Sequence, residues 1–178
     1  MIDADEAVIL VDADDNSIGT ISKLDAHRTG QLHRAFSVFI VNSSGQILLQ
    51  RRASAKYHSG GLWTNACCGH PRPGESTHVA AERRLEEEMG IRCALTEVSA
   101  FTYCADLAND LIEHELDHVF VGTFSGDPRP SATEVGDWRW ISLQSLRDWV
   151  ATDRDAFTAW FTFALDALDL EQPVEKLR

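Results

Sequence analysis

The chain lacks any apolar run near the roughly 18 residues needed to cross a membrane. Its start, MIDADEAVIL, has no basic segment ahead of an apolar one, as a secretory leader would. We therefore expect a cytoplasmic protein without a membrane partner. In that compartment the four cysteines, at positions 67, 68, 93 and 104, are expected to be free thiols rather than a disulfide framework.

Basic residues are also scarce, with 16 Lys and Arg against 28 Asp and Glu and a net charge of -12. This balance argues against nucleic acid as a partner, because binding phosphate backbones needs a basic surface. The acidity is also compatible with a role in solubility alone. The few basic residues gather locally, in QRR at 50–52, at Lys56 and in ERR at 82–84. An anionic small molecule therefore remains a candidate substrate.

Repeats, low-complexity segments and linkers are absent, and 178 residues with 44% hydrophobic content suit one domain, 1–178, with a core about 23–165. Apolar periodicity and turn residues predict strands within 33–52 (broken by a turn at 42–45), 95–106, 113–124 and 138–143, and helices over 75–91, 142–153 and 155–170. Strands and helices mix without βαβ alternation. The prediction is an α+β fold, an α/β/α sandwich on a mixed sheet.

The stretch TNACCGHPRPGE, residues 64–75, places two cysteines side by side ahead of Gly-His-Pro. Such a pair can be metal ligands, a disulfide, or one reactive thiol beside a buried neighbour. From Gly69 the chain then resembles the Nudix box, in which a loop and helix present carboxylates to a cation that holds a diphosphate. The matching positions are Gly69, Glu75, Arg83, Leu85, Glu87, Glu88, Gly90 and Ile91.

One position departs from this pattern, because Arg84 stands where the box has a Glu. A cation there should cripple hydrolysis that depends on the helix carboxylates. Arg84 and Glu88 lie four residues apart, on one helix face. One interpretation is an ion pair on the solvent-exposed surface of the helix. The other is that both side chains bind one diphosphate, Arg84 through its guanidinium and Glu88 through a metal ion.

The segments TNACCGHP, LHRAFSVFI, GLWTN and IEHEL resemble the type I isopentenyl-diphosphate isomerases, over about Lys23 to Trp160. The resemblance implies a Nudix-like fold and the conversion of isopentenyl diphosphate to dimethylallyl diphosphate. The alternatives are a Nudix hydrolase of nucleoside diphosphate derivatives, which Arg84 disfavours, and a non-catalytic binding module, which would not need Cys68 and Glu115.

The resemblance also implies a metal site whose ligands are His27, His33, His70, Glu113 and Glu115. In a strand Glu113 and Glu115 would share a face, with His114 opposite. Three imidazoles and two carboxylates leave one octahedral position open, which fits Mn²⁺ or Mg²⁺ better than tetrahedral Zn²⁺, although zinc stays possible. His58, His78, His114 and His118 receive no role.

For proton transfer the resemblance implies Cys68, Glu115 and Tyr103, with Trp160 stabilising a carbocation by its indole face. Strand alternation would turn Cys67 away from the site. For the diphosphate it implies Lys23, Arg52, Lys56 and Arg84, with Glu88 carrying a bridging Mg²⁺; the adjacent Arg51 and Arg83 are candidates to share these contacts. The expected partner is this small molecule alone, bound by a monomer.

Overall fold

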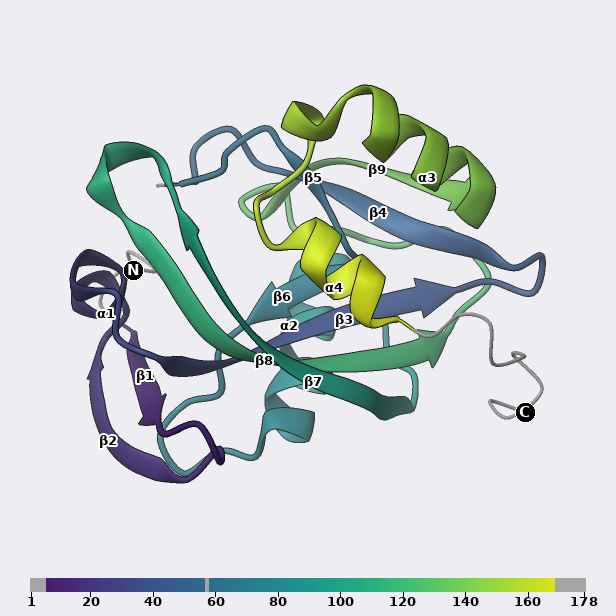
Figure 1. The fold of residues 1–178 in the computed structure, drawn as a ribbon. Helices are drawn as coiled ribbons and strands as arrows, with labels where there is room; N and C mark the ends of the chain where they lie inside the picture. Colours follow the sequence, from purple (N-terminus) through teal and green to yellow (C-terminus); the bar gives the residue numbers. More distant parts are fainter. Residues whose placement is uncertain (1–5, 57, 169–178) are drawn as a thin grey trace.

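The computed structural model describes residues 6–56 and 58–168, which form a mixed sheet with helices on both faces (Figure 1). The strands are β1 Ala7–Val11, β2 Ser17–Ser22, β3 His33–Val41, β4 Gln46–Arg52, β5 Trp63–Thr64, β6 Cys67–Gly69, β7 Leu95–Asp106, β8 Ile112–Thr123 and β9 Val135–Ser142. The helices are α1 Lys23–Thr29, α2 Thr77–Met89, α3 Leu143–Thr152 and α4 Phe161–Ala167, with 3-10 turns at Ala108–Asp110 and Arg154–Ala156.

Strand β3 organises the sheet. It runs parallel to β8 along its whole length and antiparallel to the short β6. It meets β4 only at Val41 and Ile47, and β4 then pairs with β9 instead. The predicted pair of strands within 33–52 is therefore confirmed, but the two strands diverge after the turn, and residues that line a cavity come from both of them.

The two faces of β3 belong to two separate cores. Phe36, Val38 and Ile40 pack with the buried face of α2, whereas Phe39 and Val41 pack with α3 and α4. Since neighbouring strand residues point to opposite faces, one buried strand serves both helical layers. The predicted α/β/α sandwich on a mixed sheet is confirmed.

Helix α2 lies within the predicted range 75–91 but is two residues shorter at each end, Thr77–Met89. Ser76 caps the start, where its hydroxyl accepts a hydrogen bond from Val79 N, and Gly90 ends the helix at φ 65°. A Cβ at Gly90 would lie 2.6 Å from the Arg129 carbonyl oxygen, so this position needs glycine both for space and for backbone conformation.

The prediction of one helix over 155–170 is wrong in its bounds. Within that range only Phe161–Ala167 is α-helical, Trp160 stands at the N-cap position without a side-chain hydrogen bond, and residues 169–170 lie outside the described residues. The preceding segment is drawn onto β5, because Thr158 N donates to Trp63 O at 3.0 Å and Phe157 stacks against Phe161. These contacts hold Phe157 in extended backbone and delay the helix.

The segment before β3 forms a hairpin, β1 and β2, followed by α1. Its turn is fastened to β3, where Arg34 Nε donates to Asp15 Oδ1 at 2.6 Å and Arg34 also donates to the Asp15 carbonyl. This hairpin positions α1, the helix that carries Lys23 and His27. No helix in the described ranges has the length and apolarity to span a membrane.

Candidate active site

One cavity gathers most of the side chains that the sequence marked. It is lined by Lys23, Arg52, Lys56, Cys68, His70, Arg84, Glu88, Glu113, Glu115 and Trp160, together with Glu6, Phe36, Ser37, His58 and Gly69. Of the predicted residues, His27, His33 and Tyr103 are not part of the lining. They are buried behind it and reach the cavity through Glu113 and Glu115.

Four predicted metal ligands converge at one end of the cavity. Donor atoms of His27, His33, His70 and Glu115 all lie within 4.8 Å of one another. His33 stands directly opposite Glu115 in the β3–β8 register, which explains how residues distant in sequence meet. Glu113 comes from the same face of β8 and lies 3.5 Å from His27 Nε2. His114 points away and contacts the Gly30 carbonyl, as strand alternation predicts.

The donor atoms are prepared for a cation. His33 Nδ1 contacts the Gln31 carbonyl at 2.8 Å, and since a carbonyl only accepts, Nδ1 carries the proton and Nε2 presents its lone pair. His33 Nε2 and Glu113 Oε2 are buried and make no hydrogen bond. Buried polar atoms are normally satisfied, so this end of the cavity fits a divalent metal ion.

The electrostatics of this end follow from burial. Burial lowers the pKa of His27 to about 3 and that of His70 to about 4, which keeps both imidazoles neutral and able to bind metal. Burial, followed by the charge of Glu115, raises the pKa of Glu113 well above its usual range. Burial also opposes ionisation of Glu115, but the hydrogen bond with His70 at 2.8 Å outweighs it, and the pKa of Glu115 lies well below its usual range.

The two adjacent cysteines have different surroundings. In the β3–β6 register Cys68 faces Ser37 and Cys67 faces Val38. Cys67 is therefore buried in the core on the α2 side, whereas Cys68 lines the cavity. Burial raises the pKa of Cys68 to about 12, so its sulfur carries a proton at neutral pH. All four cysteines are free, and His70 is the residue of this stretch that joins the metal cluster.

Tyr103 and Trp160 approach the cavity from different elements. Tyr103, in β7, donates a hydrogen bond to Glu115 Oε2 at 2.6 Å. Trp160 closes the wall just before α4 and is 4% exposed. The Arg52 guanidinium carbon lies 5.4 Å from the centre of its indole ring, so the ring already faces a cation in this structure.

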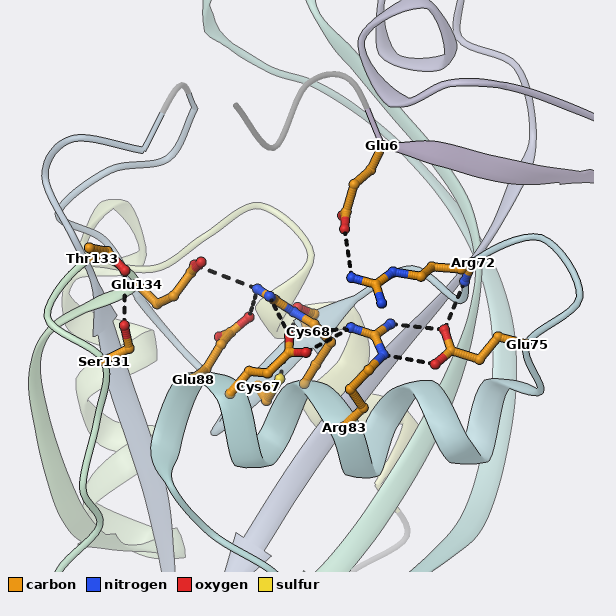
Figure 2. Close-up of polar contacts among 12 residues, drawn as sticks. Glu6, Cys67, Cys68, Arg72, Glu75, Arg83, Glu88, Ser131, Thr133 and Glu134 are labelled. Carbon is orange, nitrogen blue, oxygen red and sulfur yellow. Dashed lines mark hydrogen bonds and ion pairs between the residues drawn. The ribbon is translucent and has the colours of Figure 1, made fainter. Parts of the chain in front are cut away.

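Carboxylates hold the basic residues at the other end of the cavity, part of which Figure 2 shows. Arg84 donates to Glu88 Oε1 at 2.5 Å and lies 3.5 Å from Glu134, while Lys56 Nζ contacts Glu134 Oε2 at 2.7 Å. The i,i+4 pair expected between Arg84 and Glu88 is present, and both residues also line the cavity. Gln50 donates to the other Glu88 oxygen at 2.9 Å.

Two further arginines do not reach this end. Arg83 makes a bidentate pair with Glu75 at 2.8 Å for each bond and contacts Glu87, so these Nudix-box residues brace the loop before α2 (Figure 2). Arg51 donates to the Gly61 carbonyl. Neither Arg51 nor Arg83 lines the cavity in this structure, so their sharing of the diphosphate contacts stays a prediction.

Among the titratable residues at the cavity, sequence reasoning gave no site role to three. His58, which received no role, lines it beside His27 and Glu113. Glu6 also lines it, and Glu134 contacts two of its basic residues. No local motif marks Glu134, because it reaches the site through the long-range pairing of β9 with β4. His58 lies two residues after Lys56, and that proximity was the available signal.

Comparison with known proteins agrees with this geometry. Residues 31–161 match the family model described as NUDIX domain. The chain is 57% identical over 157 residues to an isopentenyl-diphosphate Delta-isomerase of Serratia proteamaculans, covering 88% of each chain. It is 50% identical over 167 residues to isopentenyl-diphosphate Delta-isomerase 2 of Photorhabdus laumondii, covering 94% of each.

Solved structures share the fold at much lower identity. The crystal structure of DR0079 from Deinococcus radiodurans superposes with a TM-score of 0.77 at 19% identity, over 92% of this chain and 99% of that one. A MutT protein from Methanosarcina mazei gives a TM-score of 0.64 at 23% identity, over 79% and 94%. At these identities the likeness concerns the fold alone.

Proposed function

The chain belongs to the Nudix family and, within it, to the isopentenyl-diphosphate Delta-isomerases, and on that premise we propose that its cavity interconverts isopentenyl and dimethylallyl diphosphate. The observation that carries the proposal is the placement of Cys68 and Glu115 on one cavity beside Trp160, with basic side chains at the other end. The reaction needs two proton-handling groups facing a short hydrocarbon whose diphosphate is held apart from them.

The proton movements are assigned to Cys68 and Glu115. The reaction adds a proton to the terminal carbon, C4, and removes one from C2, so one group gives a proton and another receives one. Tyr103 donates a hydrogen bond to Glu115, so its hydroxyl is assigned to proton delivery together with that carboxylate. The cation between the two steps would lie against the Trp160 ring, an interaction worth roughly 2 kcal/mol when desolvated.

The metal end is assigned to His27, His33, His70, Glu113 and Glu115. A divalent ion bound there supplies a positive charge that fixes the Glu115 carboxylate and tunes its acidity. The nitrogen-rich donor set favours Mn²⁺ over Mg²⁺, with Zn²⁺ as the competing occupant. His27 and His33 are 0% exposed, so their rings exclude water from the buried side of the Glu115 carboxylate.

The diphosphate end is assigned to Lys23, Arg52, Lys56 and Arg84, with Glu88 holding a second ion, Mg²⁺, whose remaining ligands would be phosphate oxygens. Lys56 and Arg84 contact Glu134 in this structure, so a diphosphate must replace that carboxylate at both cations. Arginine suits bidentate phosphate contacts and lysine adds a point charge.

We further propose that residues 1–178 form one domain that works as a monomer in the cytoplasm. The hairpin before the predicted core pairs with β3 in the same sheet, which supports one unit. Free thiols at all four cysteines suit a reducing compartment.

The test is incubation of the purified protein with isopentenyl diphosphate, Mg²⁺ and Mn²⁺ in D₂O, followed by proton NMR. Appearance of dimethylallyl signals with deuterium at C4 is the expected result. The Cys68→Ala protein, prepared in the same way, serves as the matched control and should give neither. Release of phosphate without rearrangement would overturn the proposal and favour a hydrolase.

A further inference from the structure

We propose that Gln50 is a positioning residue for the diphosphate end of the cavity: its side-chain amide fixes one oxygen of the Glu88 carboxylate, so that the other oxygen is presented to the Mg²⁺ ion assigned there. Gln50 lies in β4, two residues before Arg52. The inference rests on the proposed function, in which Glu88 holds that ion, and adds to it a residue that contacts neither ion nor substrate.

The amide of Gln50 is held between two acceptors. Its Nε2 donates to the Ala66 carbonyl at 3.1 Å and to Glu88 Oε2 at 2.9 Å. Since a carbonyl and an ionised carboxylate only accept, the NH₂ group of the amide must face them, and the amide cannot be turned over. Gln50 is 1% exposed and Glu88 is 5% exposed, so water competes little for these hydrogen bonds.

This orientation leaves a buried polar atom unsatisfied. Gln50 Oε1 finds no hydrogen-bond partner among the described residues. Such an atom costs free energy, and a buried polar atom without a partner calls for an explanation where it occurs. Leu48, two residues earlier on the same strand, is apolar and packs in the core beside α2. An apolar residue at position 50 would avoid the unsatisfied oxygen, so we attribute the amide to the carboxylate that it holds.

The two oxygens of Glu88 consequently have different surroundings. Oε2 faces Gln50, which does not line the cavity, whereas Oε1 accepts from Arg84, which does. Oε1 is therefore the oxygen available to an ion. Arg84 must give up this oxygen when the ion binds, and its guanidinium then becomes available to the diphosphate. With Oε2 held by Gln50, the carboxylate keeps its orientation during this exchange of partners.

The experiment measures how much Mg²⁺ improves the binding of inorganic diphosphate to the full-length protein. Calorimetric titrations with Mg²⁺, and with a chelator in its place, give two dissociation constants whose ratio is the Mg²⁺ gain. Gln50→Met keeps the length of the side chain and removes the donor. We expect the Mg²⁺ gain to fall about 10-fold, the lower end of the loss seen when a ligand loses its hydrogen-bonded support. The dissociation constant measured with the chelator should stay unchanged, whereas a merely structural role would weaken both.

A double-mutant cycle tests whether Gln50 acts through Glu88. Glu88→Gln should remove most of the Mg²⁺ gain, and adding Gln50→Met to it should cause no further loss. Gln46→Met is the matched control on the same strand. Gln46 also has a side-chain hydrogen bond, from Asn42 Nδ2 at 2.9 Å, but it does not line the cavity, so this variant should keep the full gain. Gln50→Asn, whose amide is one methylene shorter, is the second variant if Gln50→Met fails to fold, and it should show the same loss.

An undiminished Mg²⁺ gain in the Gln50 variants would overturn the inference, as would the same loss with and without Glu88→Gln. These outcomes leave the proposed function intact. If the unsubstituted protein binds diphosphate equally well with and without Mg²⁺, the ion assigned to Glu88 is wrong, and this inference is overturned with it. Absence of diphosphate binding under both conditions would overturn the whole diphosphate end of the proposed function.

Discussion

Tyr103 donates a hydrogen bond of 2.6 Å to Glu115 Oε2, and His70 Nε2 lies 2.8 Å from the other oxygen of the same carboxylate. One buried carboxylate thus joins the phenol of β7 to the metal cluster. Tyr103 does not line the cavity, so its hydroxyl acts through Glu115. The proton-handling role proposed for Glu115 therefore involves Tyr103 as well.

Replacing Tyr103 by Phe removes this hydrogen bond and keeps the ring. We expect kcat to fall about 100-fold, the lower end of what a positioned proton donor contributes, with KM changed less than about threefold. Steady-state kinetics of isopentenyl diphosphate conversion measure both. Phe163→Leu is the control, since it removes the ring that stacks on Tyr103 and leaves the hydroxyl, and it should keep kcat. Equal losses in both variants would show that packing, not the hydroxyl, matters.

The two adjacent cysteines should respond in opposite ways. Cys68→Ala should lower kcat by a factor of about 1,000 or more, because it removes a proton-handling group from the cavity. Cys67→Ala should keep most of the activity and lower the free energy of unfolding by about 1 kcal/mol, because it empties part of the α2 core. Kinetics and urea unfolding separate the two effects. The reverse pattern would mean that β6 is shifted by one residue.

The Arg34–Asp15 contact should matter for substrate binding although it lies outside the cavity. Arg34→Met keeps the stem of the side chain and releases the turn between β1 and β2, so α1 loses its fixed position. We expect KM to rise about three- to tenfold with kcat within twofold, and stability to fall by about 1 kcal/mol. Arg28→Met, on the exposed side of α1, is the matched control. An unchanged KM would show that the hairpin is not needed to place Lys23.

The metal-free protein should lose stability as the pH falls below neutral. Burial lowers the pKa of His70 from 6.5 to about 4, so the unfolded chain takes up a proton that the folded chain refuses. The contribution of His70 to stability is therefore fully present above pH 6.5 and is lost as the pH falls toward 4. Glu113, with a raised pKa, acts with the opposite sign above pH 4.5. The contribution of His70 is therefore measured by comparing how the free energy of unfolding changes with pH in different variants.

Urea unfolding with a chelator at several pH values between 4.5 and 7.5 measures that difference. His70→Asn should show a smaller decline than the unsubstituted protein, because the variant has no imidazole to protonate. His78→Asn, on a side chain that is 47% exposed, should decline like the unsubstituted protein. If His70→Asn declines as steeply, then His70 is not the source of the acid sensitivity.

Much of the fold could be predicted because its strands carry local signals. The apolar runs of β3 and β8 and the caps Ser76 and Gly90 of α2 depend on neighbours in sequence, and the structure has them near the predicted positions. The start of α4 could not be predicted, because contacts of Phe157 and Thr158 with β5 override a helical pattern. Tertiary contacts decided that boundary.

Part of the site could likewise be predicted from the sequence, and part could not. The faces of Glu113 and Glu115, and of Cys67 and Cys68, follow from strand alternation, and the structure places them accordingly. His58 could not be assigned, because its ring is oriented by a tight loop whose backbone no short motif specifies. Its neighbours in the cluster, His27 and Glu113, come from other elements.

The parallel pairing of β3 with β8 also bears on how the molecule folds. His33 and Glu115 meet only after the intervening helix and β7 have been bridged, and pairings of such sequence separation form slowly. Because His33 lies in β3, Glu115 in β8 and His70 directly after β6, the cluster is complete only once all three strands have joined. A metal ion added during refolding should therefore leave the rates of the early steps unchanged. It should bind only at the last step and stabilise the folded product. The moment of metal binding would then report when the sheet is complete.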